Sequence, residues 1–181
     1  MKKFLILLFV LVLVGCENNS KTSDDNNKIS YTNKFECFTK SELTEFDLNN
    51  RQSSSNTGTS TILTKEQLEE KKNSPVAVNK TQKKIYDFDK EGKKLIKYLD
   101  VEEFEYLVDI DMAEEKKYFE EACKNISKDR YKSCTVEVNE NVLTVTKTNN
   151  LDSEMNKNIK ETTTLDGIKE SYLDDELFTC Q

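Results

Sequence analysis

The sequence of 181 residues contains no histidine and no tryptophan, and it has only one proline and four glycines. Without histidine, the chain lacks the Ser-His and Cys-His pairs of nucleophilic catalysis and every imidazole metal ligand. It also lacks an excess of positive charge, because 34 acidic side chains outnumber 27 basic ones. A chain of this charge has no basic surface for nucleic acid, so we expect no nucleic-acid partner. The length suggests one domain, and the activity is left open.

The chain begins with a short basic head followed by an apolar stretch. Lys2 and Lys3 precede eleven apolar residues, 4–14, and polar residues follow from Glu17 onward. This pattern predicts a secretory signal peptide over residues 1–15. As a helix, the eleven apolar residues rise about 16 Å, roughly half the hydrocarbon thickness of a bilayer, so the stretch is too short to span a membrane.

The end of this signal, Leu13-Val14-Gly15-Cys16, resembles the lipobox of bacterial lipoproteins. In that family a small residue precedes the cysteine, the cysteine thiol receives a diacylglyceryl group, and a peptidase cuts just before it. The resemblance implies that Cys16 is lipidated and begins the mature chain. An anchor with at least two acyl chains attaches a protein stably to the membrane, here on its extracytoplasmic face. An ordinary secreted protein with a chance cysteine at this position is the alternative.

Removal of residues 1–15 takes away two lysines and no acid, so the expected net charge changes from −7 to −9. Residues 16–34 then comprise the lipidated cysteine and a polar segment with a single aliphatic residue, Ile29. Such a composition buries too little surface to offset the entropy of ordering, so we expect a flexible tether. Its mean reach is on the order of 25 Å. The remainder, 35–181, is the expected single extracytoplasmic domain.

Residues 47–82 contain few apolar side chains and include a serine-rich, low-complexity run. We expect this segment to be a loosely ordered insertion that follows a first strand over 35–40. Within it, Thr64 and Gln67 have the spacing of a capping box and predict a short helix with Leu68 facing inward.

Apolar side chains become denser after Lys83 and predict most of the regular structure. The expected strands are 84–89, 94–107, 134–138 and 142–147, the expected helices are 111–126 and 165–173, and 177–180 is extended. The apolar phase slips between Val101 and Phe104, which allows a β-bulge there. The sequence therefore predicts an α+β domain. Its antiparallel sheet has about five strands, from two hairpins plus terminal strands, with one long helix packed on one face and a short C-terminal helix.

The order of these segments resembles the YehR-like small lipoproteins of unknown function and related low-GC bacterial lipoproteins. The likeness covers most of residues 83–181 and includes a Thr-Cys-polar tail, here Thr179-Cys180-Gln181. No catalytic motif defines that family, so the resemblance implies an envelope lipoprotein but no activity and no site. The 47–82 insertion and the extra cysteines depart from the family pattern.

Four of the five cysteines remain for the folded domain once Cys16 carries lipid. An even number of cysteines in an exported domain favours two disulfides, with three possible pairings. We expect Cys123–Cys134, because a ten-residue connection lets the chain turn back from the long helix onto the next strand. We expect Cys37–Cys180, because this bridge ties the first strand to the last. No Cys-x-x-Cys pair is present, so zinc is the weaker alternative, and we expect neither metal nor cofactor.

Two further patterns along the first hairpin could carry chemistry. The spacing of Asp87, Asp89 and Glu91 resembles the opening of an EF-hand loop, but Tyr98 stands where that loop requires a bidentate carboxylate. We therefore interpret this run as a hairpin turn with solvated acids. Aromatic residues also follow the hairpin, and they form either part of the core or an exposed face for a partner or glycan. These aromatic residues are Tyr86, Tyr98, Phe104 and Tyr106.

Three hypotheses for the function remain. The first is a membrane-anchored, non-catalytic binding or interaction module of the cell envelope, with an envelope protein or a glycan as its partner. The second is an extracytoplasmic hydrolase that uses carboxylates, although no two of the 34 acids stand out. The third and weakest is an accessory solute-binding lipoprotein, because the mature chain is short for a two-lobed binding protein. A pocket with two carboxylates of raised pKa would favour the enzyme.

Overall fold

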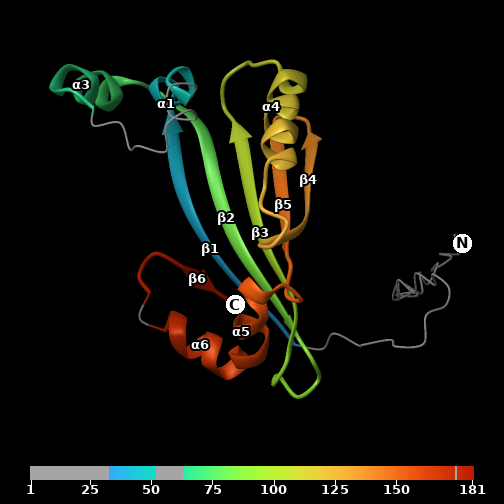
Figure 1. Cartoon of the computed structure of the whole chain (residues 1–181). Helices are drawn as coiled ribbons and strands as arrows, with labels where there is room; N and C mark the ends of the chain where they lie inside the picture. Colours follow the sequence, from blue (N-terminus) through green and yellow to red (C-terminus); the bar gives the residue numbers. More distant parts are fainter. Residues whose placement is uncertain (1–32, 52–62, 174) are drawn as a thin grey trace, which may run out of the picture.

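The computed structural model describes residues 33–51, 63–173 and 175–181 (Figure 1). The predicted signal peptide, Cys16 and nearly all of the expected tether lie outside these residues. Within them, six strands form one antiparallel sheet in the order β4-β5-β3-β2-β1-β6. The strands are β1 (Asn33–Thr44), β2 (Val76–Phe88), β3 (Leu95–Tyr106), β4 (Tyr131–Asn139), β5 (Val142–Asn149) and β6 (Thr179–Cys180). The predicted α+β class with an antiparallel sheet is confirmed, with six strands in place of about five.

Several helices, rather than one long and one short, accompany this sheet. They are α1 (Glu45–Asn49), α3 (Lys65–Asn73), α4 (Met112–Lys124), α5 (Glu154–Thr162) and α6 (Leu165–Tyr172). Figure 1 shows α4 beside β4 and β5 toward one end of the sheet, and α5 and α6 toward the other end. The helices therefore cover the two ends of the sheet and leave its middle between them.

Buried apolar side chains form two separate clusters, one beneath each group of helices. The first, which we call the α6 cluster, has α6 and β6 packed against it and consists of Phe35, Cys37, Tyr86, Phe88, Leu95 and Leu151. The second, which we call the α4 cluster, has α4 packed against it and consists of Ala77, Val78, Phe104, Tyr106, Leu143 and Val145. Burial of apolar area at these two places contributes about 25 cal/mol per Å². It is the main force that holds the helices on the sheet.

The strand register places both clusters on one face of the sheet. Tyr86 lies opposite Tyr98, and Lys80 lies opposite Phe104 on the neighbouring strand. Because side chains alternate along a strand, the even-numbered residues of β2 and β3 between these pairs point to the same face. That face therefore changes from apolar to polar and back to apolar along the length of β2 and β3.

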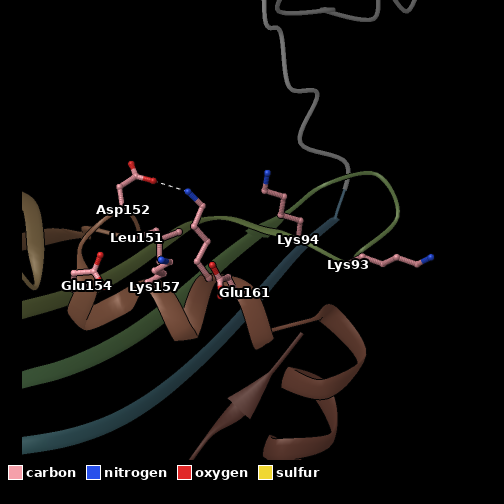
Figure 2. A pocket seen from close by; sticks show the side chains of 8 residues that line it. Lys93, Lys94, Leu151, Asp152, Glu154, Lys157 and Glu161 are labelled. Atoms are coloured by element: carbon pink, nitrogen blue, oxygen red, sulfur yellow. Dashed lines mark hydrogen bonds and ion pairs between the residues drawn. The ribbon is translucent and has the colours of Figure 1, made fainter.

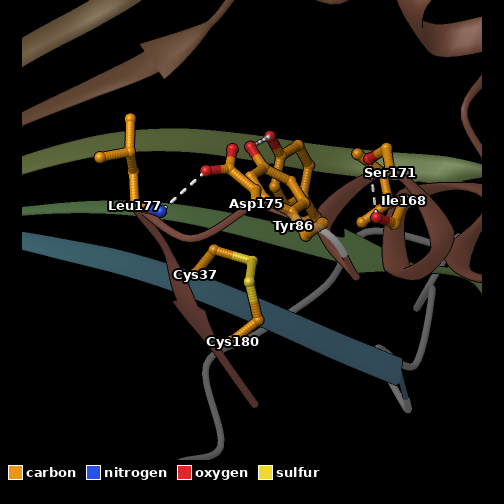
Figure 3. Close-up of a disulfide and its surroundings, with 8 residues drawn as sticks. Cys37, Tyr86, Ile168, Ser171, Asp175, Leu177 and Cys180 are labelled. Atoms are coloured by element: carbon orange, nitrogen blue, oxygen red, sulfur yellow. Dashed lines mark hydrogen bonds between the residues drawn. A yellow bond between two sulfur atoms is a disulfide. The ribbon is translucent and has the colours of Figure 1, made fainter.

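Two disulfides connect the cysteines in the pairing that we predicted, Cys37–Cys180 and Cys123–Cys134. The Cα atoms are 4.1 Å apart in the first pair and 5.5 Å apart in the second. Cys37 and Cys180 are also register partners in the short β1–β6 ladder. Figure 3 shows their bridge between β1 and β6. This bridge supplies the covalent attachment of a strand only two residues long.

The β2–β3 hairpin turn is ordered by backbone conformation and by one carboxylate. Gly92 has a φ of +66°, a left-handed conformation that glycine adopts without the steric cost of a Cβ atom. One Asp89 carboxylate oxygen accepts hydrogen bonds from the amides of Lys93 and Lys94. The Asn33 side-chain amide donates to the Asp89 carbonyl at 3.0 Å. The first described residue of β1 is therefore held at this turn, and the predicted hairpin is confirmed.

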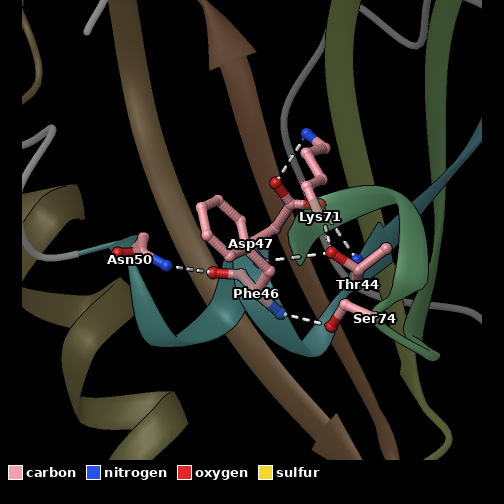
Figure 4. A network of polar contacts seen from close by, with 6 residues as sticks. All are labelled: Thr44, Phe46, Asp47, Asn50, Lys71 and Ser74. Atoms are coloured by element: carbon pink, nitrogen blue, oxygen red, sulfur yellow. Dashed lines mark hydrogen bonds and ion pairs between the residues drawn. The ribbon is translucent and has the colours of Figure 1, made fainter. Parts of the chain in front are cut away.

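At the opposite end, polar contacts hold α1 and α3 together (Figure 4). Thr44 and Asp47 form a capping box at α1, and the Lys71 ammonium of α3 lies 2.7 Å from the Asp47 carboxylate. The Ser74 hydroxyl accepts a hydrogen bond from the amide of Phe46, the buried residue of α1. Burial acts to raise the pKa of Asp47, but hydrogen bonds from Lys71 and Thr44 outweigh it and lower that pKa.

Several expected boundaries around the first strands were wrong. Residues 76–82 of the expected insertion belong to β2, and β1 continues four residues beyond the predicted end at Lys40. These two segments pair with each other, and their side chains are mostly polar. Because strands are recognised in a sequence by alternating apolar residues, the polar parts of this ladder were not predicted. The predicted helix with the Thr64 capping box is confirmed, but Leu68 is 46% exposed rather than inward.

Two other expectations are corrected farther along the chain. The stretch that we left as a polar linker contains α5, which is held by a buried amide rather than an apolar stripe. The Asn156 side chain donates to the carbonyls of Arg130 and Asn150. The bulge that the sequence allowed between Val101 and Phe104 is absent, because the β2–β3 register is regular there and shifts only between Asp87 and Phe88.

Removal of the two disulfides should have unequal effects. Cys37→Ala with Cys180→Ala opens a loop with a sequence separation of 143, whereas Cys123→Ala with Cys134→Ala opens one with a separation of 11. The chain-entropy model then gives a loss of unfolding free energy of about 5 kcal/mol for the first pair and about 3 kcal/mol for the second. Chemical denaturation of the two double variants measures the difference. A larger loss for the 123–134 pair would contradict this account.

Candidate functional site

The polar middle of the sheet, between the α6 cluster and the α4 cluster, is hollowed into a groove. We call it the cross-sheet groove, and its cavity volume is about 190 Å³. Its floor is the middle of β2, β3 and β5, and its walls come from the start of β4 and from the C-terminal segment. The lining residues are Gln82, Lys83, Lys84, Asp100, Val101, Glu102, Arg130, Tyr131, Lys147 and Phe178.

Glu102 is the centre of an ion-pair network on this floor. Its carboxylate lies 2.8 Å from the Lys80 ammonium and 3.1 Å from the Lys147 ammonium, and it accepts a hydrogen bond from Gln82. Burial acts to raise the pKa of Glu102, but the hydrogen bonds from Lys80 and Gln82 and the charge of Lys147 hold that pKa at about 2. Glu102 is therefore a fixed negative charge whose partners satisfy it at neutral pH.

Asp100, two residues earlier on the same face, has a different environment. Its carboxylate accepts one hydrogen bond from the Tyr98 hydroxyl and one from the Asn149 side-chain amide, each at 3.0 Å. Burial and the negative charge of Asp100 raise the pKa of Tyr131. Within the described part of the chain, no ion pair joins Asp100 to a lysine or arginine. The groove thus contains a carboxylate bound only by neutral donors.

Two cations in the groove contact aromatic rings instead of carboxylates. The Lys84 ammonium lies 5.2 Å from the centre of the Phe178 ring, and the Arg130 guanidinium lies 5.2 Å from the centre of the Tyr131 ring. Neither cation forms an ion pair with any of the described residues. Cation–π contact at exposed sites contributes only about 0.5–1 kcal/mol, so these donors remain available to an anion.

A larger hollow of about 540 Å³ lies between α5 and the β2–β3 hairpin (Figure 2). It contains basic and acidic side chains together, and Lys160 pairs with Asp152 across it. Figure 2 shows the Lys93 side chain pointing away from α5, so the hairpin lysines do not converge on one point. The cross-sheet groove is the better candidate because two of its unpaired charges, Lys84 and Asp100, lie on the strands β2 and β3, and the third, Arg130, directly precedes β4.

The structure also locates the other residues that the sequence singled out. Tyr86, Phe104 and Tyr106 are buried, with 5%, 6% and 2% of their surfaces exposed, so the alternative of an exposed aromatic face is wrong. Asp89 orders a hairpin turn, as interpreted. No group of three or more acidic or cysteine side chains suited to a metal ion occurs among residues 33–51, 63–173 and 175–181. In the same residues, no helix has the length and apolar character needed to cross a bilayer.

The residues of the groove were not predicted from the sequence. The signal that could have found them is a polar run in the middle of two apolar strands, at Lys80–Lys84 and at Asp100–Glu102. Because we interpreted the second run as a slip in the apolar phase, we did not expect these carboxylates on the helix-bearing face.

Comparison with known proteins adds no further assignment. No family model matches this chain, and no curated protein and no solved structure matches it significantly.

Glu102→Gln should expose the contribution of the ion-pair network to stability. At neutral pH we expect the free energy of unfolding to fall by about 1–2 kcal/mol, once solvent screening of a partly exposed site is allowed for. Because the folded-state pKa of Glu102 is about 2 against an ordinary 4.5, the wild-type advantage is present above pH 4.5 and is lost as the pH falls toward 2.

Chemical denaturation of both proteins across this pH range measures the effect. Glu103→Gln is the matched control, because Glu103 forms one ion pair, with Lys83. Its side chain also points to the other face of the sheet. Equal losses of stability for the two variants at every pH would contradict the special position of Glu102.

Proposed function

We propose that this protein is a lipid-anchored, extracytoplasmic binding module of the cell envelope, and that it holds its ligand in the cross-sheet groove. The observation that carries the proposal is the coexistence of unpaired charges of both signs, Asp100 with Lys84 and Arg130, in one groove. Lys84 and Asp100 are half-buried and Arg130 is exposed, so a ligand could reach all three and supply the ionic partners that the first two lack in their partly desolvated positions. Preformed sites of this kind orient a ligand through a few polar groups.

The chemistry of the groove supports binding more than hydrolysis. A general acid at neutral pH needs a carboxyl pKa raised toward 7, as in glycosidases. Glu102 has the opposite environment, since Lys80 and Lys147 keep it ionised down to a pH of about 2. No particular observation favours the hydrolase or the accessory solute-binding lipoprotein over the binding module. An envelope protein or a glycan is the expected class of partner.

The anchor follows from the lipobox resemblance and agrees with the position of Asn33. The segment that would connect Cys16 to the domain joins it at Asn33, which is bound to the β2–β3 turn. Along β3, Leu95 and Glu102 are seven residues apart, or about 23 Å at 3.3 Å per residue. The groove would therefore lie about 20 Å beyond the end of the domain that the tether reaches, within range of the envelope close to the membrane.

Cys16→Ser should abolish the anchor without changing the fold. The wild-type protein should incorporate labelled fatty acid and partition into the detergent phase of a cloud-point extraction, because two or more acyl chains bind a membrane stably. The variant should lose the label and partition into the aqueous phase. Cys123→Ala with Cys134→Ala is the control for loss of a cysteine elsewhere. Retention of label by Cys16→Ser would contradict lipidation at this residue.

Site-specific photocrosslinking in cells tests whether the groove is the binding surface. A photoreactive residue replaces Gln82, which is exposed at the groove, or Thr135, which is exposed on the other face of the sheet. We expect an adduct from position 82 and little from position 135. The adduct should weaken when Arg130→Gln is added. No adduct from position 82, or equal adducts from both positions, would contradict the proposal, as would measurable hydrolysis of wall fragments.

A further inference from the structure

Arg130 and Lys84 are the groups of the groove that can bind an anionic part of a ligand. The Arg130 guanidinium lies over the Tyr131 ring and the Lys84 ammonium over the Phe178 ring. A guanidinium that stacks on a ring keeps its in-plane N–H groups free, and these match a carboxylate or phosphate in a bidentate arrangement. Both cations line the same groove and lack carboxylate partners within the described residues, so each could donate to an anionic group there.

Asp100 is the group of the groove that can bind a cationic part of a ligand. Lys84 and Asp100 are register partners on adjacent strands, so an ion pair between them would be expected. They do not form one, because the Lys84 ammonium turns to Phe178 while Asp100 accepts from Tyr98 and Asn149. One of those hydrogen bonds goes to each oxygen of Asp100, and the Tyr131 hydroxyl is a third donor to the same carboxylate, which leaves about one of its four lone-pair sites for an ammonium.

Glu102 cannot provide the same site for a cation. Lys80, Lys147 and Gln82 already occupy its carboxylate, and the two lysines more than balance its charge. A cationic group of a ligand would therefore be drawn to Asp100 rather than to Glu102. The groove thus offers Asp100 to a positive group, and Lys84 and Arg130 to a negative group.

The size of the groove limits the ligand further. Its volume of about 190 Å³ is below the roughly 300–1,000 Å³ of sites that enclose a drug-sized molecule. The groove therefore holds a small molecule or the end of a larger one. We propose that it binds a zwitterionic group, with the ammonium on Asp100 and the anionic group on Arg130 or Lys84. This inference rests on the proposed binding function and specifies its ligand class.

Two sources offer this chemistry, an amino acid with free amino and carboxylate groups and a phosphoethanolamine headgroup. The test titrates ¹⁵N-labelled lipidated mature protein in detergent micelles with L-alanine and with phosphoethanolamine. Propionate and ethylamine serve as probes that carry one charge each. We expect saturable shifts of the groove amides with at least one zwitterion, at about threefold to fivefold higher affinity than with either single-charge probe, since one added exposed ion pair contributes up to about fivefold.

Variants assign the two halves of the site. Asp100→Asn should weaken the zwitterion up to about fivefold and should not weaken propionate, because it removes a negative charge beside the cations, whereas Arg130→Gln should weaken both. Glu105→Gln, an exposed acid of β3 outside the cross-sheet groove, should change neither. Unperturbed amide shifts of β4 and β5 outside the groove establish that each variant is folded. Alanine alone as ligand identifies amino-carboxylate recognition, and phosphoethanolamine alone identifies headgroup recognition; either supports the inference.

The inference is overturned if no zwitterion gives saturable shifts, if zwitterions bind no better than the single-charge probes, or if Asp100→Asn has no effect. These outcomes are distinguishable from failure of the proposed function. An adduct from position 82 without zwitterion binding would retain the binding module and reject this ligand class. Absence of both would reject the two together.

Discussion

The pairing of three long strands is the constraint on which the rest of this structure depends. β1, β2 and β3 contain 12, 13 and 12 residues, and they form nearly continuous antiparallel ladders. At about 3.3 Å per residue such strands extend roughly 40 Å, which is long for a domain of this size. The apolar residues of the chain are too few to cover one face over that length. The fold resolves this by placing apolar clusters and helices at the two ends only.

The ion pairs in the middle of the face follow from the same constraint. Where no helix covers the strands, Lys80, Glu102 and Lys147 pair across three neighbouring strands. Isolated surface pairs add little stability, but a network of several charges on rigid strands adds more because its side chains lose less entropy. The polar middle of the sheet is therefore stable without a cover, and it remains accessible. Accessibility at that place is what makes a groove with binding chemistry possible.

The extent to which sequence predicted structure depends on the kind of interaction that forms each element. Alternating apolar residues identified the two hairpins, and the placement of cysteines on expected elements identified both disulfide pairs. The long helix was recognisable because Met112, Phe119 and Cys123 recur on one face and pack against the α4 cluster. These features depend on local periodicity, which a single sequence contains.

Features stabilised by polar contacts were harder to predict. α5 is positioned by the buried Asn156 amide, which donates to the carbonyls of Arg130 and Asn150. No periodic pattern of residues in the sequence indicates these two contacts. The groove residues were not predicted for a related reason. Asp100 and Glu102 on a helix-bearing face looked like an interruption of an apolar pattern, because nothing local indicates that lysines of two other strands will pair with them. The extension of β1 depended likewise on its partner, β2.

The attachment of Asn33 to the hairpin turn also determines how the domain would bear mechanical load. A force that pulls on Asn33 along β1 acts at right angles to the β1–β2 hydrogen bonds, so many of them resist together in shear. Four residues later the Cys37–Cys180 bridge transfers part of that load covalently to the C-terminal segment. β1 therefore cannot be drawn out of the sheet alone. A domain held by its first strand in this way resists extraction as a unit, even though its apolar core is divided in two.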